Sequence, residues 1–427
     1  MPAARRVAII GAGWAGLAAA VASTQRGDRV TLFEMAPQAG GRAREVMWDG
    51  TALDNGQHIL IGAYSETLRL MRVVGVNVEQ SFLRTPLRII YPEGAGLQLQ
   101  AGTPALAFAR AVLRYRGWSW RERLALLRAA GGWRLRGFKC DAARTVTELT
   151  AGLPAKVRAE LIDPLCVAAL NTPSGEASAS VFLRVLKDAL HSGPGSADLL
   201  LPRVSLSEAF PAPALRWLEH AGASLRLGQR VEQLSIYGGH RSVDGEPFDQ
   251  VVLATPSGEA ARLTQAIAPA WSRAAAALRY EPIVTVYLRS AGCVLPAPML
   301  ALHSDDDTLA NAPAQFVFDR GQLGGSQGLL AFVISGAQAW VDAGAQVSLQ
   351  ATLTQAQSAL SAHLRGPLQA LKVLTEKRAT FRCTPKLHRP ASAIAPGLQA
   401  AGDYIAGPYP ATLEGSVRSG IAAVTGM

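Results

Sequence analysis

The N-terminal region alternates between apolar runs and polar breaks in the pattern of an α/β unit. Val7–Ile10 is short and continuously apolar, and Val30–Phe33 is apolar apart from Thr31, which is typical of parallel strands buried on both faces. The stretch between them is rich in alanine and uncharged as far as Gln25, which predicts a buried helix. Because it follows two arginines, this stretch also has features of a signal peptide, but its regularly spaced glycines and charged continuation indicate mature structure. We therefore predict a strand, turn, helix and strand within an α/β fold.

The first predicted strand is followed by glycines with the spacing G-x-G-x-x-G, at Gly11, Gly13 and Gly16. The first glycine permits a tight turn, the second lets backbone approach a pyrophosphate, and the third lets helix and strand pack closely. Glu34 ends the second strand, where a carboxylate binds ribose hydroxyls and repels the 2′-phosphate of NADP. The sequence therefore predicts a dinucleotide site, which also includes Ala12 and Ala15 of the same turn.

The segment EMAPQAGGRAR continues from Glu34 through Gly40, Gly41 and Arg42. It resembles the glutathione-reductase-like FAD fold, and within that fold the amine oxidase and phytoene desaturase branch. The resemblance implies that FAD is the cofactor and that Gly41 and Arg42 bind it. On charge alone, a guanidinium suits a phosphate. The implied architecture is a Rossmann-like FAD-binding domain with an interleaved α+β substrate domain.

Polar residues run directly into an apolar run in the segment LDNGQHILIGAY, residues 53–64. In the amine-oxidase-like families a D-x-G segment at this distance from the glutamate passes beside the flavin ring. The resemblance therefore places Asp54, Gly56, Gln57 and His58 beside the flavin, while Ile59–Ile61 continues into the core. The alternative is a turn that only caps a helix beginning near Ser65.

The C-terminal segment LQAAGDYIAGPYPATLEGSVRSG resembles the second FAD motif of the same families. By that resemblance, Gly402 and Asp403 end a strand near the ribityl chain and Asp403 accepts a ribityl hydroxyl. A helix would then begin with Thr412, Leu413 and Gly415, and its N-terminus would face the N1–O2 edge of the flavin, where it stabilises negative charge. Between the two motifs, the resemblance places a strand around 230–234, a hairpin and a strand at 251–254, with the backbone of Val231 against the adenine.

Cofactor motifs at both ends and in the middle of the chain predict a discontinuous FAD-binding domain. We assign it to residues 1–84, 199–290 and 384–427. The remainder, 85–198 and 291–383, is predicted to form a substrate and membrane-facing domain, helical in its first part and mixed in its second.

Positive charge is concentrated in one segment of a chain whose net charge is +10 and whose pI is about 9.8. Within residues 105–139, here called the basic segment, Glu122 is the only acid. Ser119 and Glu122 form a capping box for a helix that we expect Gly131 and Gly132 to end. Arginines, tryptophans and leucines at helical spacing suit a helix at an anionic membrane surface. The nine bases are Arg110, Arg114, Arg116, Arg121, Arg123, Arg128, Arg134, Arg136 and Lys139.

The alternative for the basic segment is a solvated face on an ordinary helix. Nothing in the sequence resembles a nucleic-acid-binding module, and charges elsewhere are balanced. We expect a cytoplasmic protein that associates peripherally with the inner face of the cell membrane. The four cysteines have neither CxxC spacing nor nearby histidine pairs, so we expect no disulfide framework and no metal site.

Three stretches together resemble the squalene-associated FAD-dependent family, the hydroxysqualene dehydroxylases of bacterial hopanoid synthesis: LDNGQHILIGAYSET, PLCVAALNTPSGEASA and AGDYIAGPYPATLEGSVRSG. The resemblance covers nearly the whole chain. It implies reduction of hydroxysqualene, a C30 isoprenoid, to squalene with loss of water, by hydride transfer from N5 of reduced flavin. An acid must protonate the departing allylic hydroxyl. The candidates are His58, favoured because imidazole titrates near neutrality, then Asp54, Tyr404 and Tyr409, with Asn171 orienting the hydroxyl.

Other functions are compatible with the same motifs. One is an oxidative desaturase of phytoene or a carotenoid, and another is an amine or porphyrinogen oxidase. A third is a non-catalytic FAD-binding scaffold for an isoprenoid synthase, and a hydroxysqualene or presqualene synthase would be its partner. Because the sequence shows no second dinucleotide fingerprint, the electron donor is left open.

Overall fold

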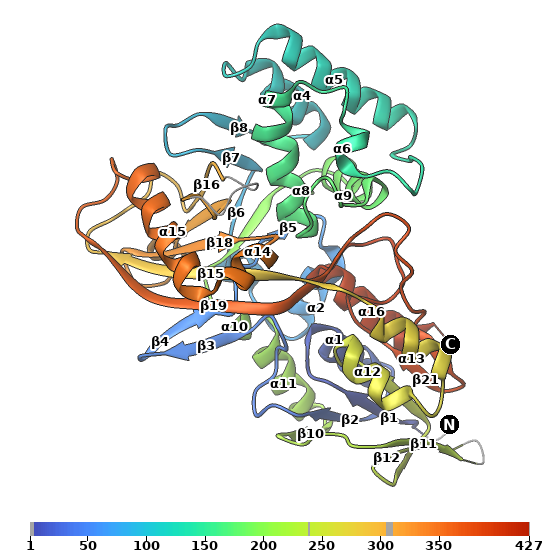
Figure 1. The fold of residues 1–427 in the computed structure, drawn as a ribbon. Helices are drawn as coiled ribbons and strands as arrows, with labels where there is room; N and C mark the ends of the chain where they lie inside the picture. Colours follow the sequence, from blue (N-terminus) through green and yellow to red (C-terminus); the bar gives the residue numbers. More distant parts are fainter. Residues whose placement is uncertain (1–3, 238–239, 305–310, 427) are drawn as a thin grey trace.

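The computed structural model describes residues 4–237, 240–304 and 311–426 (Figure 1). Its central element is a six-stranded sheet in the order β10–β2–β1–β14–β21–β20, parallel except for β20 against β21. The predicted N-terminal strands are β1 and β2, and the α/β fold class is confirmed. The strands are β1 (Arg6–Ile10), β2 (Arg29–Glu34), β10 (Ser224–Leu227), β14 (Gln250–Leu253), β20 (Ala393–Ala395) and β21 (Leu398–Ala400).

The two ends of the chain lie side by side against this sheet. Helix α1 (Trp14–Gln25) packs against α16 (Leu413–Thr425) and α11 (Pro211–His220) (Figure 1). The contact between α1 and α16 is so close that a Cβ on Gly420 would lie 2.1 Å from the carbonyl oxygen of Ala15. The alanine-rich sequence of α1 permits this approach, because it puts few bulky side chains between the helices.

A second, antiparallel sheet has the order β16–β17–β18–β15–β19, and it extends away from the first (Figure 1). Helices α14 (Gln338–Ala343) and α15 (Ala345–Ala359) pack against it. The strands are β15 (Tyr280–Ser290), β16 (Met299–Ala301), β17 (Phe316–Asp319), β18 (Leu329–Ile334) and β19 (Leu368–Phe381).

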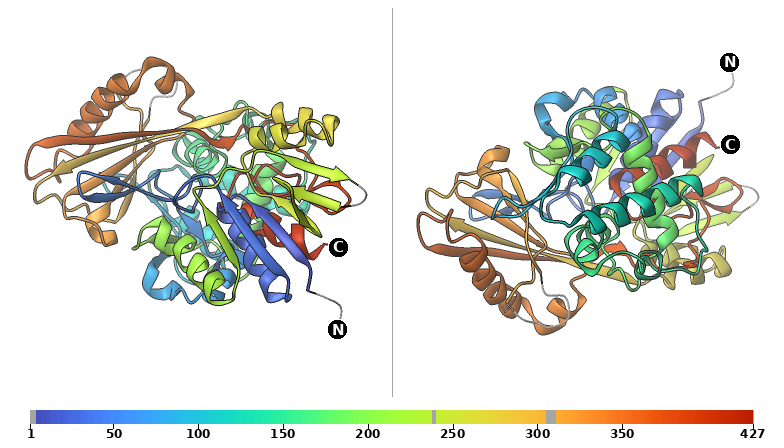
Figure 2. Two further views of the ribbon diagram at one scale, coloured as in Figure 1. Left: turned by 90° about the horizontal axis from the view of Figure 1, so that it is seen from below. Right: turned by 90° about the horizontal axis from the view of Figure 1, so that it is seen from above.

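A layer of helices covers one end of the molecule, with α4 and α5 outermost (Figures 1 and 2). The layer consists of α4 (Pro104–Arg114), α5 (Trp120–Leu135), α6 (Val146–Leu149), α7 (Ala155–Val157), a π-helical turn (Arg158–Ile162), α8 (Asp163–Leu170) and α9 (Ala179–His191). Besides these, the structure has a three-stranded sheet, β5 (Leu60–Ile61), β9 (Leu199–Pro202) and β6 (Phe82–Thr85), and two hairpins, β3 (Glu45–Trp48) with β4 (Thr51–Asp54) and β7 (Arg88–Ile90) with β8 (Gly96–Gln98).

The remaining elements are connecting helices and a second three-stranded antiparallel sheet, in the order β11–β12–β13. They are α2 (Ser65–Val73), α3 (Val78–Ser81), α10 (Leu206–Ala209), β11 (Leu234–Tyr237), β12 (His240–Val243), β13 (Glu246–Phe248), α12 (Ser257–Thr264), α13 (Pro269–Ala276) and a 3₁₀ turn (Arg320–Leu323). None of the helices among the described residues is both long and apolar enough to cross a bilayer.

Two local predictions were wrong. The capping box of Ser119 and Glu122 is present, but α5 continues through Gly131 and Gly132 to Leu135. The continuation is held by Trp133, which is buried, and a helical glycine costs only about 1 kcal/mol relative to alanine. The helix ends where Gly137 takes a left-handed conformation. The strand expected around 230–234 begins only at Leu234, and the hairpin turn at 238–239 lies outside the described residues.

The division into two domains stays a prediction. Strand β15 falls in the segment 199–290, which we assigned to the FAD-binding domain, yet it pairs with β18 and β19 in the five-stranded sheet.

Candidate active site

A cavity of about 1150 Å³ runs from the carboxyl ends of β1 and β2 to the helical layer. Typical ligand pockets measure ~300–1,000 Å³. Residues of the N-terminal, middle and C-terminal motifs all line this one cavity. The predicted cofactor residues that line it are Gly11, Gly13, Ala15, Glu34, Gly41, Arg42, Gly56, Gln57, Val231, Gly402, Asp403, Thr412 and Leu413.

The glycine turn has the geometry expected for close packing around a phosphate. Gly11 has a φ of +104°, and a Cβ there would lie 2.6 Å from the carbonyl oxygen of Ala254. Gly16 does not line the cavity, because it packs under the turn: its Cβ would lie 1.8 Å from the carbonyl oxygen of Gly11. Gly13 faces Gly41, and the cavity passes this pair of residues without side chains. A dinucleotide backbone can therefore approach the main chain here.

Glu34 is held beside this turn by backbone donors. Its carboxylate accepts the N–H of Ala12 at 2.7 Å and the N–H of Ala36 at 2.9 Å. Ala12 itself is buried and does not line the cavity, so its contribution is to position Glu34. The carboxylate lines the cavity, where its unused lone pairs can accept ribose hydroxyls.

Arg42 and Asp403 join the two ends of the chain. The guanidinium donates to the Asp403 carboxylate at 2.6 Å and to the carbonyl oxygen of Ala379 at 2.7 Å. Both residues line the cavity, one as a cation and the other as a hydrogen-bond acceptor. Together with the side-chain-free glycine turn and Glu34, they provide the donors and acceptors that fit the pyrophosphate, ribose and ribityl groups of FAD.

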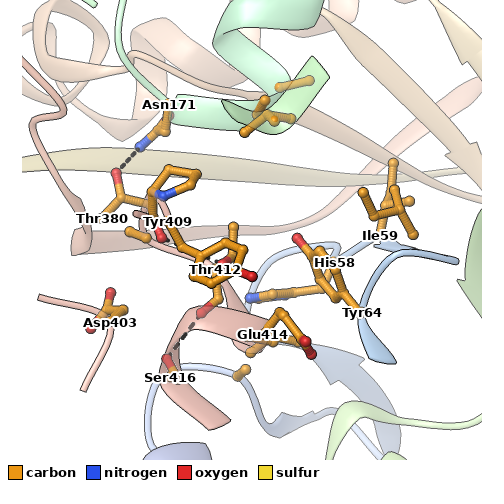
Figure 3. Close-up of a pocket in the computed structure, with 18 of the residues that line it drawn as sticks. His58, Ile59, Tyr64, Asn171, Thr380, Asp403, Tyr409, Thr412, Glu414 and Ser416 are labelled. Atoms are coloured by element: carbon orange, nitrogen blue, oxygen red, sulfur yellow. Dashed lines mark hydrogen bonds between the residues drawn. The ribbon is translucent and has the colours of Figure 1, made fainter. Parts of the chain in front are cut away.

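The N-terminus of α16 points at the same part of the cavity as His58, Tyr64 and Tyr409 (Figure 3). Thr412 caps the helix, because its hydroxyl accepts the N–H of Gly415 at 3.1 Å. Gly415 lies behind this cap and does not line the cavity. The thirteen-residue helix therefore presents its positive end to the cavity, where it favours negative charge on a bound group.

The side chains of the segment from Asp54 to His58 face two different sides. Asp54 faces away from the cavity: its carboxylate accepts the N–H of Leu206 at 2.9 Å and lies 3.8 Å from Arg320. Gly56, Gln57 and His58 line the cavity. The segment is thus a buried one with a cavity-lining side, and its apolar continuation forms β5.

His58 is held as a neutral ring. Its Nδ1 lies 3.0 Å from the carbonyl oxygen of Gly56, so Nδ1 carries the proton that it donates and Nε2 is an acceptor. The loss of solvent around the ring lowers the pKa of His58 below its usual 6.5. The side chain is therefore uncharged near neutral pH.

The two predicted tyrosines differ in their surroundings. Tyr404 is buried, and its hydroxyl has no hydrogen-bond partner among the described residues. Burial also raises the pKa of Tyr404, so the phenol keeps its proton. Tyr409 is half-buried, and its hydroxyl oxygen accepts a hydrogen bond from Arg184 at 3.2 Å. Both side chains line the cavity.

Asn171 lines the cavity but is used by the fold. It ends α8 in a left-handed conformation, and its side-chain amide donates to Thr380 at 3.0 Å (Figure 3) and to the carbonyl oxygen of Glu281 at 3.2 Å. Its Oδ1 accepts the N–H of Gly336 at 2.7 Å. These bonds tie α8 to the five-stranded sheet, which favours a structural role.

Away from the glycine turn, many apolar side chains from the helical layer and the neighbouring strands line the cavity, with a few charged residues, such as Arg88, Arg134 and Asp188, among them. This part, here called the apolar arm, includes Leu87, Ile89, Leu97, Phe108, Leu126, Leu127, Leu161, Leu165, Val185, Leu186, Met299 and Phe316.

The sequence analysis did not predict two groups near the N-terminus of α16, Glu414 and Tyr64. Glu414 is buried, and its carboxylate accepts the backbone N–H groups of Glu66 and Thr67 at the start of α2. Tyr64, just before α2, lines the cavity, and burial raises its pKa. The only sequence signal was the acid at the start of a predicted helix, which is usually a solvent-exposed feature.

Comparison with known proteins shows the family to which this chain belongs. Hydroxysqualene dehydroxylase of Sinorhizobium fredii is 28% identical over 97% of this chain and 96% of its own length. The enzyme of that name from Zymomonas mobilis is 26% identical over 96% of each chain. An oxidoreductase structure from Methanosarcina mazei superposes with a TM-score of 0.72 at 16% identity, covering 99% of this chain and 100% of that one, which shows a shared fold. The flavin containing amine oxidoreductase family matches residues 14–427, so the chain belongs to that family and is an FAD-dependent oxidoreductase.

Proposed function

We propose that this enzyme reduces hydroxysqualene to squalene with loss of water, as a step of hopanoid synthesis. The observation that carries the proposal is that the apolar arm is continuous with the dinucleotide end of the cavity. Similarity to hydroxysqualene dehydroxylases over nearly the full length supports it as well.

The apolar arm suits a long hydrocarbon better than a polar substrate. Burying one methylene contributes about 0.8 kcal/mol, so a C30 chain leaves a membrane only for a site of similar apolarity. The cavity walls along the arm supply leucine, isoleucine, valine, methionine and phenylalanine side chains. An amine or a porphyrinogen would bring polar groups beside these apolar side chains, which offer no hydrogen-bond partners.

The residues that would hold FAD are the glycine turn, Glu34, Arg42, Asp403 and the N-terminus of α16. When bound in its reduced state, FAD supplies a hydride to the allylic carbon that the hydroxyl leaves. The same walls that bind the hydrocarbon exclude water, which would otherwise capture an allylic cation. With one proton added to the departing hydroxyl, the products are squalene and water.

Tyr409 is the acid that the contacts favour. His58 is neutral, and its one ring proton is directed at Gly56, so it has none to give at Nε2. Asp54 faces away from the cavity. The hydroxyl oxygen of Tyr409 accepts from Arg184, and the same guanidinium lies 5.1 Å from the centre of its ring. Because the oxygen of Tyr409 accepts from Arg184, its own hydroxyl proton is available to be donated to a substrate hydroxyl.

The reaction is tested by anaerobic incubation of the photoreduced FAD enzyme with hydroxysqualene. We expect squalene in an amount equal to the flavin reoxidised. The oxidised enzyme is incubated with phytoene in parallel: a desaturated product there, with no squalene in the first reaction, would identify a desaturase instead. Bound flavin that neither substrate oxidises or reduces would identify a scaffold.

The acid is tested with Tyr409→Phe, with His58→Ala as the comparison. Loss of a general acid lowers the single-turnover rate by about 10²–10⁴-fold. We expect this loss for Tyr409→Phe with unchanged flavin absorbance, and a rate within about tenfold of wild type for His58→Ala. A full rate for Tyr409→Phe would remove the assignment and leave the reaction class intact.

The partners follow from the same reading. We expect a separate electron donor, because the sequence has one dinucleotide fingerprint, and a synthase that delivers hydroxysqualene. The enzyme would act at the inner face of the cell membrane, where such a substrate resides.

A further inference from the structure

The outer helices α4 and α5 expose an unusual share of large apolar side chains. Of the twelve exposed large hydrophobic residues among the described residues, five lie on these two helices. They are Leu106, Leu113, Trp120, Leu124 and Leu135, and Leu135 is 91% exposed. Of the other seven, Met47 and Trp48 are neighbours on β3, and the remaining five are separated in the sequence, which is ordinary for a protein surface.

On α5 these residues form one line along the helix. Trp120, Leu124, Gly131 and Leu135 are spaced by four, seven and four residues, so they project from the same side. We call them the outer stripe. Arg121 and Arg128, both exposed, flank it. The opposite side of α5 holds Leu126 and Trp133, which are buried.

The charge around the outer stripe is not neutralised. Within the described part of the chain, none of the nine bases of the basic segment forms an ion pair with a carboxylate. Glu122 is occupied in the capping box. These cations are therefore available to an anionic partner.

A smaller cavity of about 380 Å³ lies between α4 and the β7–β8 hairpin. It is lined by Arg110, Arg114 and Arg116, together with Gln98 and Gln100. Three cations and two amides with no acid among them form a site for a phosphate group.

The large cavity opens beside the outer stripe. Gly131 and Arg134 of α5 and His191 at the end of α9 line the cavity and are also exposed to solvent. Gly131 belongs to the stripe itself, between Leu124 and Leu135. The apolar arm thus reaches the surface on the same face that carries the exposed leucines and the unpaired arginines.

We infer that this face docks on an anionic lipid bilayer and that the opening at Gly131 is the portal through which the hydrocarbon substrate enters from the lipid. Trp120, Leu124 and Leu135 would enter the boundary between headgroups and acyl chains, the flanking arginines would contact lipid phosphates, and the smaller cavity would hold one headgroup phosphate. The portal rests on the proposed function, whereas docking does not.

Docking is tested by flotation of the purified FAD enzyme with vesicles of phosphatidylglycerol or of phosphatidylcholine. We expect binding to the anionic vesicles that Leu124→Asp/Leu135→Asp weakens more than tenfold. Arg121→Gln/Arg128→Gln should weaken it about 25-fold, since each base near an anionic leaflet contributes about fivefold. Met47→Asp is the matched control, because Met47 is 60% exposed on a hairpin far from α5, and it should bind as wild type.

Flavin absorbance and thermal unfolding show that each variant is folded, which is expected because every changed side chain is exposed. Equal binding of wild type and Leu124→Asp/Leu135→Asp would overturn the docking surface. Stronger binding to duplex DNA than to anionic vesicles would also overturn it.

The portal is tested with Gly131→Trp, which places a bulky side chain at the opening. We expect flavin absorbance to be unchanged, vesicle binding to be at least as strong as that of wild type, because Gly131 lies on the outer stripe and tryptophan favours the lipid interface, and the turnover of vesicle-embedded hydroxysqualene to fall at least tenfold. Wild-type turnover in this variant would remove the portal. Should wild type itself produce no squalene, the proposed function fails while the vesicle experiment still decides the docking.

Discussion

The carboxylate of Glu414 offers a sharp test of how the cavity is held together. It accepts hydrogen bonds from the N–H of Glu66 at 3.1 Å, the N–H of Thr67 at 2.9 Å and the hydroxyl of Thr67 at 2.7 Å, and Arg418 donates to it at 2.7 Å. These bonds fix the start of α2 to the start of α16. Tyr64 and Thr412, which directly precede these two helices, both line the cavity.

The perturbation we choose is Glu414→Ala. Thr67 is only 1% exposed, so its N–H and hydroxyl lose their acceptor and cannot reach water. Each buried group left unsatisfied costs about 1–3 kcal/mol, which gives roughly 2–6 kcal/mol for the two. Glu66 and Arg418 are more exposed and regain water, so they add little. Glu414→Gln retains one oxygen and should lose about half as much.

The measurement is urea unfolding of the apoprotein at equilibrium, followed by titration with FAD. We expect Glu414→Ala to lower the free energy of unfolding by about 4 kcal/mol and to weaken FAD binding, because the N-terminus of α16 is no longer fixed. Glu66→Ala is the control on the same helix, since its exposed ion pair with Arg69 contributes only ~0.5 kcal/mol. A Glu414→Ala variant within about 1 kcal/mol of wild type would refute this account of the contact.

Two further predictions use matched or pH-dependent comparisons. Gly11→Ala should abolish FAD binding and destabilise the protein by more than Gly27→Ala, because both glycines have positive φ but only Gly11 would bring a Cβ within 2.6 Å of a backbone oxygen. Equal stability of the two variants in thermal unfolding would contradict this. Burial raises the pKa of Asp54 above its usual 3.8, so the folded protein holds this proton more tightly than the unfolded chain. The free energy of unfolding of the wild type should therefore fall relative to that of Asp54→Asn as the pH rises from below 3.8 toward neutrality. A difference between the two proteins that stays constant between acidic and neutral pH would contradict the prediction.

Local sequence patterns were sufficient to predict the strands and helices around the proposed cofactor site. The apolar runs of β1 and β2, the glycine spacing and the threonine before α16 are each read within a few residues, and the structure has them where the sequence predicts. The meeting of the two ends of the chain around one cavity was also predictable, because the two terminal motifs resemble parts of one known site.

Features that depend on contacts between distant parts of the chain could not be predicted from the sequence. Thr67, which donates to Glu414, lies 347 residues earlier in the chain, so no local pattern shows the contact. Asp54 ends a strand in which neighbouring side chains alternate between faces, and a shift of one residue decides whether it meets the cavity or Leu206. The length of α5 depended on Trp133 finding a buried site, which outweighed the two glycines.

The central claim is that one cavity holds both the flavin and a long hydrocarbon. A crystal structure of the FAD enzyme with squalene tests it most directly. The account predicts FAD along the glycine turn, Arg42 and Asp403, and squalene in the apolar arm between α5 and α9 with the carbon that accepts the hydride toward the flavin ring. Squalene bound outside that arm, or FAD away from the glycine turn, would contradict it.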